Sequence, residues 1–278
     1  MHTSTIAILG AGNMGASLLG GLIATGLKPE KIWIADPDAQ KLSVLKKQFN
    51  IHVTENNQEA VEVADVVIFA IKPQVMAHVV QSLSRLIQTR KPLVISIAAG
   101  IREKNFQTWL GGNIAIVRCM PNTPALIRCG VTALFANEFV SAAQRELAES
   151  ILSAVSTLVW LEDENQMDAV TALSGSGPAY FFLVIEALQH AGEKLGLSAD
   201  MSKQLTLQTA YGAARMALEI DMPIEKLRQN VTSPGGTTEA ALLILEKGNL
   251  RELFASAILA AKSRSEQLAE TFSQEAAS

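Results

Sequence analysis

Hydrophobic and polar positions alternate in two different ways along the chain. Up to about residue 160, short apolar runs typical of strands alternate with amphipathic segments typical of helices. Strands are predicted at 5–9, 31–35, 51–53, 65–71, 93–97 and 114–118, with helices at 16–23, 38–48, 57–63 and 74–86. Beyond Asp163 the strand pattern stops, and helices are predicted at 164–173, 178–195, 199–219, 223–230, 237–247 and 250–273. This change divides the chain.

The fold class that follows is α/β plus α. Strands that alternate with helices form a doubly wound, Rossmann-like parallel sheet. We predict this dinucleotide-binding domain over residues 1–162 and an all-helical domain over residues 163–278. No low-complexity linker separates the two domains. The boundary is instead placed where the spacing of hydrophobic positions stops indicating strands and indicates helices alone.

The turn after the first strand reads Gly10-Ala11-Gly12-Asn13-Met14-Gly15. Gly-x-Gly-x-x-Gly between a strand and a helix places the pyrophosphate of a dinucleotide at the helix N-terminus. Asp36 ends the second strand, about 20 residues further on, where an acidic residue binds the adenosine ribose. An equally good interpretation of Asp36 is a turn residue before Pro37.

Other Gly- and Pro-rich turns fall at the carboxyl ends of the predicted strands. They are Lys72-Pro73, Ala98 to Gly100, and Met120-Pro121-Asn122 with Thr123 to Ala125. In a doubly wound sheet the ligand crevice lies at these ends. Their grouping is the best internal support for a cofactor site.

A second candidate binding segment leads into the helix predicted at 237–247. Residues 231–239 read Val-Thr-Ser-Pro-Gly-Gly-Thr-Thr-Glu, with no basic residue. Gly235 and Gly236 allow a close backbone approach, and the amides of Thr237 and Thr238 lie in the first helical turn, where an anion is favoured. The segment could hold a small carboxylate, or it could be a turn before a helix.

Composition excludes several classes of protein. The chain has 278 residues, 49% of them hydrophobic and 5% aromatic, with a net charge of −4 and no basic run. Nucleic acid is therefore not an expected partner. We expect neither a membrane segment nor a metal site, because glycines interrupt the uncharged N-terminal stretch and the two cysteines and four histidines lack ligand spacing. The thiols suggest a reducing cytoplasm, and the aliphatic surplus suggests an oligomer.

The motifs together resemble the pyrroline-5-carboxylate reductases. These motifs are the N-terminal glycine turn, Lys72-Pro73, Met120 to Ala125, Leu173-Ser174-Gly175-Ser176-Gly177-Pro178-Ala179-Tyr180, and Ser233 to Thr238. The resemblance runs over essentially the whole chain in the same order. It implies NADPH- or NADH-dependent reduction of a cyclic imine, 1-pyrroline-5-carboxylate, to L-proline, the final step of proline biosynthesis.

The resemblance also implies roles for individual residues. Gly10 to Gly15 match the pyrophosphate turn, Asn57 the adenosine side, Ala70 to Pro73 the nicotinamide ribose, and Met120 to Pro124 the nicotinamide. Ser233, Gly235, Gly236, Thr237 and Thr238 match the substrate loop, with the Thr238 hydroxyl facing the imine nitrogen. Family members are dimers with interlocked helical domains and shared active sites, and several form decamers.

The chemistry of an imine agrees with the lack of a basic catalytic residue. Reduction of a carbonyl usually needs a positioned Lys or His, and the similarly organised β-hydroxyacid dehydrogenases carry a lysine on the helix after their glycine turn. Here Pro178 to Leu183 offer none. Alternatives left open are another imine or β-hydroxyacid oxidoreductase on the same plan and a non-catalytic dinucleotide-binding scaffold. Asp36 would repel a 2′-phosphate, so NADH is expected to be usable.

Overall fold

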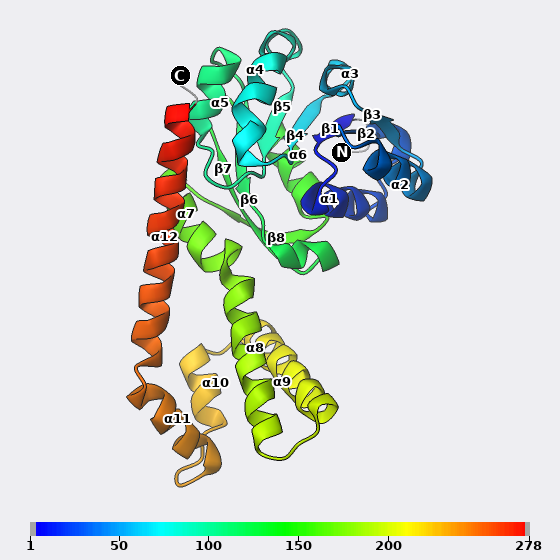
Figure 1. The fold of residues 1–278 in the computed structure, drawn as a ribbon. Helices are drawn as coiled ribbons and strands as arrows, with labels where there is room; N and C mark the ends of the chain where they lie inside the picture. Colours follow the sequence, from blue (N-terminus) through cyan, green and yellow to red (C-terminus); the bar gives the residue numbers. More distant parts are fainter. Residues whose placement is uncertain (1–3, 276–278) are drawn as a thin grey trace. The chain divides into compact units, whose positions relative to one another are not determined.

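The computed structural model describes residues 4–275 and divides into two compact units. The first unit comprises the chain up to Ser176 and again from Ala261 onward, and the second comprises Gly177–Ala260. Figure 1 shows the elements of both units in chain order.

An eight-stranded sheet forms the first unit, in the order β3-β2-β1-β4-β5-β6-β7-β8. The strands are β1 (Ile6–Leu9), β2 (Ile32–Ala35), β3 (His52–Thr54), β4 (Val66–Phe69), β5 (Leu93–Ser96), β6 (Ile116–Met120), β7 (Gly130–Ala136) and β8 (Ser156–Trp160). The first six are parallel, which confirms the predicted doubly wound sheet. The sequence analysis missed β7 and β8, which run in the opposite direction.

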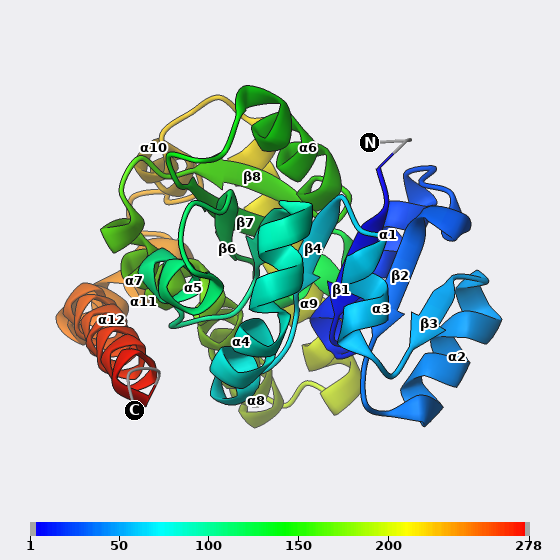
Figure 2. The same cartoon turned by 90° about the horizontal axis from the view of Figure 1, so that it is seen from above.

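Helices cover both faces of this sheet (Figure 2). On one face α1 (Asn13–Ala24), α2 (Ala39–Phe49) and α6 (Ala142–Leu152) pack on the β-branched residues of the strands. On the other face lie α3 (Asn57–Glu62), α4 (Pro73–Arg90) and α5 (Glu103–Leu110). The sheet is therefore buried on both sides, which explains why its strands are continuous apolar runs rather than alternating ones.

The first unit is completed by two segments beyond residue 162. The chain passes through the 3₁₀ turn η3 (Glu164–Gln166), α7 (Met167–Val170) and a π-helical turn (Thr171–Gly175). The second half of α12 (Leu250–Glu275) returns to the same unit, where Ser265 donates a 2.6 Å hydrogen bond to the buried Asp168 carboxylate. The boundaries of the two units in the chain therefore fall at 176/177 and 260/261. The hydrophobic pattern of the sequence, by contrast, changes from alternating strands and helices to helices alone at 162/163.

The second unit is entirely helical, as predicted. It contains α8 (Gly177–Lys194), α9 (Ala199–Glu219), α10 (Ile224–Asn230), α11 (Thr237–Lys247) and the first half of α12. Ser198 caps α9 by accepting a hydrogen bond from the Met201 amide at 3.3 Å. The predicted helices coincide with these to within a few residues, because capping residues and glycines mark their ends clearly in the sequence.

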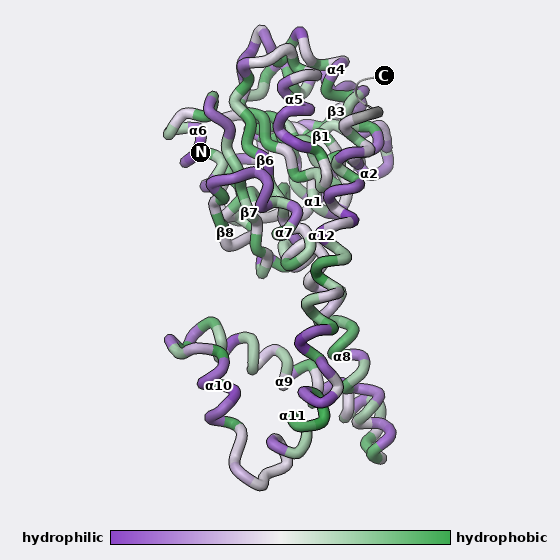
Figure 3. The backbone as a smooth tube through the Cα atoms, turned by 90° about the vertical axis from the view of Figure 1, so that its left-hand side faces the viewer, coloured by the Kyte–Doolittle hydropathy of each residue, from purple (hydrophilic) through white to green (hydrophobic). Residues whose placement is uncertain are grey.

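The helical unit buries almost nothing within itself. Between Gly177 and Ala260 only Gly177 and Ser202 are buried. Hydrophobic stretches lie along its helices (green in Figure 3), and large apolar side chains such as Phe181 and Leu183 are 72% and 66% exposed. A soluble monomer rarely exposes this much contiguous apolar surface. We therefore expect a second copy of the chain to cover it.

Assembly through this unit predicts that unfolding and dissociation are coupled. Raising the protein concentration about a hundredfold should raise Tm by several degrees, because association stabilises only the folded chain. Leu183→Glu should abolish the dimer, since it places a charge on the apolar helix face. The matched control is Val44→Glu on α2, a similarly exposed position (61%) of the first unit. A concentration-independent Tm together with a monomeric mass from ultracentrifugation would contradict this expectation.

Candidate functional site

The glycine turn after β1 is shaped by two close approaches. Gly10 has φ of 111°, and a Cβ there would lie 2.5 Å from the carbonyl oxygen of Ala70, which follows β4. A Cβ at Gly15 would overlap the carbonyl oxygen of Gly10. The first and third glycines are therefore required for packing at the point between β1 and β4 where the strand order reverses.

The second glycine of the turn differs from the other two. A Cβ at Gly12 would meet no atom within 4 Å, so the backbone here borders open space. Gly12 is also the N-cap of α1, which has neither a capping side chain nor an acidic residue in its first turn. The free amides of such a helix end attract an anion. This geometry suits the predicted pyrophosphate turn at residues 10–15, which includes Ala11, Asn13 and Met14, and the nucleotide contact itself stays a prediction.

Asp36 closes the turn from the end of β2. Its carboxylate accepts a hydrogen bond from the Ala11 amide at 2.7 Å and another from the Asp38 amide at 2.9 Å. Each oxygen therefore already has one backbone donor, and the charge stays beside the turn. Asp36 therefore orders the turn, as one of its two interpretations predicts, and its contact with the ribose stays a prediction.

The nearest cationic residue downstream of Asp36, Lys41, pairs with a different carboxylate. Asp38 caps α2, and its carboxylate lies 3.4 Å from the Lys41 ammonium. The hydrogen bond from the Lys41 backbone amide, helped by the Lys41 side chain, holds the pKa of Asp38 below its usual value against the opposing effect of desolvation. Lys41 therefore neutralises Asp38 rather than Asp36.

The remaining predicted cofactor residues all lie at the same edge of the sheet. Asn57 opens α3 after β3, Lys72 and Pro73 begin α4 after β4, and Ala98 and Gly100 follow β5. A cavity of about 380 Å³ lies there within the first unit. Its walls come from the ends of β4 and β5 and from two segments beyond the sheet, and the lining residues are Pro73, Gln74, Ala99, Gly100, Thr171, Ser176, Ala261, Arg264, Ser265, Leu268 and Phe272.

The Met120-Pro121-Asn122 segment is held against the π turn. The Asn122 side-chain amide lies 3.4 Å from both the carbonyl oxygen and the hydroxyl of Ser174, and its own oxygen accepts from the Val131 amide at 3.0 Å. A Cβ at Gly175 would collide with the methyl group of Met120. Two motifs that are far apart in the sequence, Met120 to Asn122 and Ser174-Gly175, are thus adjacent.

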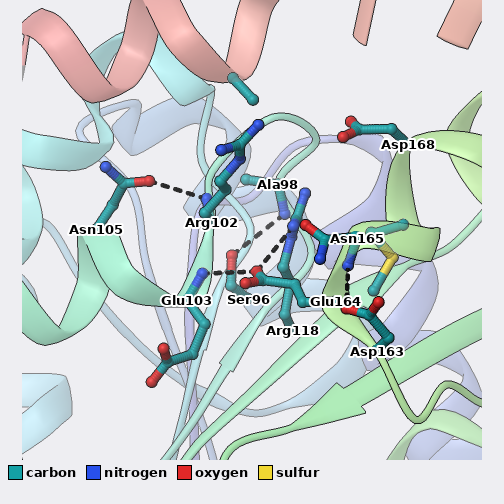
Figure 4. A network of polar contacts seen from close by, with 12 residues as sticks. Ser96, Ala98, Arg102, Glu103, Asn105, Arg118, Asp163, Glu164, Asn165 and Asp168 are labelled. Atoms are coloured by element: carbon teal, nitrogen blue, oxygen red, sulfur yellow. Dashed lines mark hydrogen bonds and ion pairs between the residues drawn. The ribbon is translucent and has the colours of Figure 1, made fainter. Parts of the chain in front are cut away.

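A buried ion pair beside these loops was missed by the sequence analysis (Figure 4). Arg118 in β6 is only 3% exposed, and its Nη1 lies 2.8 Å from a carboxylate oxygen of Glu164. The same oxygen accepts the amide of Glu103, the first residue of α5, at 2.7 Å. The sequence does contain one signal for this pair, an arginine between Val117 and Cys119 in an apolar strand. A charged side chain in a buried strand indicates a partner of opposite charge, because a buried charge is stable only when it is paired.

The Ser233 to Thr238 segment lies in the second unit and precedes α11. Gly235 has φ of 71°, and the Gly236 amide donates to the Ser233 carbonyl at 3.0 Å. Gly236 is the N-cap of α11 and provides no capping side chain, so the amides of Thr237 and Thr238 begin the helix as predicted. The Gly235 amide is bonded to the Glu239 carboxylate at 2.7 Å. An acidic group therefore already occupies one amide of the segment.

Three further features of the described residues concern metal binding, thiol reactivity and membrane insertion. They contain no group of three or more His, Cys, Asp or Glu side chains arranged to hold a metal ion. Burial raises the pKa of the Cys119 thiol far above its usual value, so this thiol is unreactive. One helical run, Glu164–Lys194, is long and apolar enough to cross a membrane by length and composition alone.

Two protein-family models match the chain, one in the sheet-containing N-terminal part and one in the helical C-terminal part. The model described as pyrroline-5-carboxylate reductase dimerisation matches residues 164–268, which include the apolar run. The model described as NADP oxidoreductase, coenzyme F420-dependent, matches residues 5–100. The same apolar helices that resemble a membrane span thus belong to a dimerisation domain, so the chain is a homo-oligomer.

Individual relatives agree over nearly the full length. A pyrroline-5-carboxylate reductase of Pseudomonas aeruginosa is 51% identical over 99% of this chain and all of its own, and one of Pasteurella multocida is 39% identical over 98% of this chain and all of its own. The structure of a pyrroline-5-carboxylate reductase from Coxiella burnetii superposes with a TM-score of 0.92 at 47% identity, covering 96% of this chain and 98% of that one. The Plasmodium falciparum pyrroline carboxylate reductase with NADP bound superposes with a TM-score of 0.86 at 31% identity, covering 97% and 99%. The chain belongs to the pyrroline-5-carboxylate reductase family.

Proposed function

We propose that this protein reduces 1-pyrroline-5-carboxylate to L-proline with NADPH or NADH. The observation that carries the proposal is that one chain, which matches a relative of this family over the whole of that relative, contains both an open glycine turn and a base-free loop at a helix N-terminus. When bound, the reduced nicotinamide supplies a hydride to the imine carbon, and the protonated nitrogen takes up the electron pair of the C=N bond. The residues need only bind and orient the two partners.

The dinucleotide is assigned to the carboxyl edge of the sheet. The amides of Asn13, Met14 and Gly15 at the start of α1 are assigned to the pyrophosphate, with Gly10, Ala11 and Gly12 forming the turn before them. Asp36 and Asn57 are assigned to the adenosine. The nicotinamide half is assigned to the turns after β4, β5 and β6, namely Ala70, Lys72, Pro73, Ala98, Gly100, Met120, Pro121 and Asn122. Their common position at the edge where the strand order reverses supports this assignment.

The substrate is assigned to the segment before α11. The amides of Thr237 and Thr238 at the start of the helix favour the carboxylate, with Ser233, Gly235 and Gly236 shaping the approach. The Thr238 hydroxyl is assigned to the imine nitrogen, where it can solvate the developing amine. No side chain in the segment has to transfer a proton, because the imine can be protonated in water before the hydride arrives.

The assembly is assigned to a homodimer through the C-terminal helices, with each active site formed by two chains. Stacking of dimers into a decamer is the further arrangement that the family resemblance suggests. The cytoplasm is the assigned location, because the coenzyme and the reduced thiols belong there. We assign no nucleic acid or membrane as a partner.

The direct test is NAD(P)H oxidation by the purified protein with 1-pyrroline-5-carboxylate, followed by identification of proline. Another imine or a β-hydroxyacid as the better substrate would support a different oxidoreductase on the same plan. Nucleotide binding without turnover of any of these substrates would support a scaffold. Either result would overturn the proposal.

Two alanine substitutions should separate binding from folding in the glycine turn. Gly12→Ala should fold with an unchanged Tm, because the new methyl group meets no protein atom, yet raise Kd for NAD(P)H at least about tenfold by occupying the pyrophosphate cradle. Gly15→Ala should instead lower Tm, because its methyl group would collide with the Gly10 carbonyl. Fluorescence titration and thermal unfolding measure the two effects. Tight nucleotide binding by Gly12→Ala would exclude this turn as the pyrophosphate site.

Asp36 should bias the enzyme toward NADH. A carboxylate held beside the ribose repels a 2′-phosphate, and within residues 4–275 no Lys, Arg or His forms an ion pair with it. Asp36→Ser should raise kcat/KM for NADPH relative to NADH and lower Tm slightly, because the Ala11 amide loses its acceptor. Asp38→Ser is the control, since it removes a nearby carboxylate that faces Lys41. A wild-type enzyme that already prefers NADPH about tenfold would show that Asp36 acts only on the turn.

Thr238→Ala should lower kcat by about one to two orders of magnitude with little change in NAD(P)H affinity. A hydrogen bond to a developing charge contributes roughly 1.5–3 kcal/mol. Thr238→Ser retains the hydroxyl and should recover most of the rate. Equal rates for the alanine variant and the wild type would remove the hydroxyl from the mechanism.

A further inference from the structure

One carboxylate oxygen connects three elements of the first unit. Oε1 of Glu164 in η3 lies 2.8 Å from Nη1 of Arg118 in β6 and accepts the Glu103 amide at the start of α5 at 2.7 Å. The Arg118 Nε is buried and has no hydrogen-bond partner among the described residues. Arg118 therefore depends on Glu164 as its one charged partner within 4.0 Å in the described chain.

Each of the three connected elements carries a loop at the candidate nicotinamide edge. Ala98 to Gly100 lie just before α5, Pro121 and Asn122 follow Met120 at the end of β6, and the π turn with Ser174 follows η3 and α7. Ser96 is paired with Arg118 across β5 and β6, and its hydroxyl accepts the Ala98 amide at 3.4 Å. Arg118 and Glu164 themselves do not line the cavity at this edge.

We propose that Arg118 and Glu164 are a positioning pair for hydride transfer, which sets the spacing of these three loops around the nicotinamide. This inference rests on the proposed reductase function. Since neither side chain lines the cavity, the pair acts through the backbone of the loops and not by contact with the reacting atoms. Figure 4 shows Arg118, Glu164 and the Glu103 amide converging beneath Ala98.

The physical reason is that such a pair fixes geometry more than it adds stability. Replacement of a buried ion pair by neutral groups of similar size is often neutral for folding, whereas removal of one partner leaves an uncompensated buried charge. A displacement of about 1 Å at the reacting groups can cost about a hundredfold in rate. Variants that remove one charge and variants that remove both can therefore distinguish an effect on loop geometry from an effect on folding stability.

The experiment compares Glu164→Gln, Arg118→Met and the double variant with the wild type. Glu164→Gln keeps an oxygen for the Glu103 amide and leaves Arg118 without a countercharge. The double variant removes both charges and the β6–η3 connection. Ile151→Val, a fully buried position on α6, is the control for a modest loss of Tm. Tm, kcat, KM for 1-pyrroline-5-carboxylate and Kd for NAD(P)H are measured for each.

The double variant should regain a Tm close to that of the wild type while its kcat stays at least about tenfold lower. Its Kd for NAD(P)H should change less than about threefold, because the glycine turn that holds the pyrophosphate is untouched. Recovery of kcat together with Tm, or a loss of kcat no larger than in Ile151→Val, would overturn the inference. An inactive wild type that still binds NAD(P)H would instead refute the proposed function.

Discussion

Burial of the helical unit against a second copy of the chain is the constraint on which the rest of the structure depends. Ordering a chain costs conformational entropy at every residue, and burial of apolar surface is the main compensation. Between Gly177 and Ala260 that compensation is missing inside the chain, since nearly every large apolar side chain is at least partly exposed. The segment before α11 belongs to this unit.

Both candidate binding segments present backbone amides and no basic side chain. In each, a glycine precedes a helix without a capping side chain, at Gly12 before α1 and at Gly236 before α11. The nearest charged groups are acidic, with Asp36 bonded to the Ala11 amide and Glu239 to the Gly235 amide. Such carboxylates hold the loops in shape before a ligand binds, which reduces the entropy lost on binding.

The sequence predicted the elements better than it predicted their connections. Strands β1 to β6 and the C-terminal helices follow from apolar runs, glycines and caps, because these signals are local. The antiparallel β7 and its partner β8 were missed, although β7 (Gly130–Ala136) is mostly apolar and β8 (Ser156–Trp160) is only partly buried. The turns of the candidate site were placed at the correct strand ends. The Arg118–Glu164 pair could not be predicted, since its partners lie 46 positions apart and its geometry depends on tertiary packing.

The helical unit is an insertion rather than an extension of the chain. The chain leaves the first unit after Ser176 and re-enters it at Ala261, and both residues line the same cavity. A stop codon after Ser176 would therefore remove the half of α12 that supports Asp168 and covers Gly100. Joining residue 176 to residue 261 through a short flexible linker would instead remove the inserted helices and keep both segments of the first unit in one continuous chain. The dinucleotide-binding half of this protein is thus to be isolated by internal deletion, as a discontinuous domain, and not by truncation from either end.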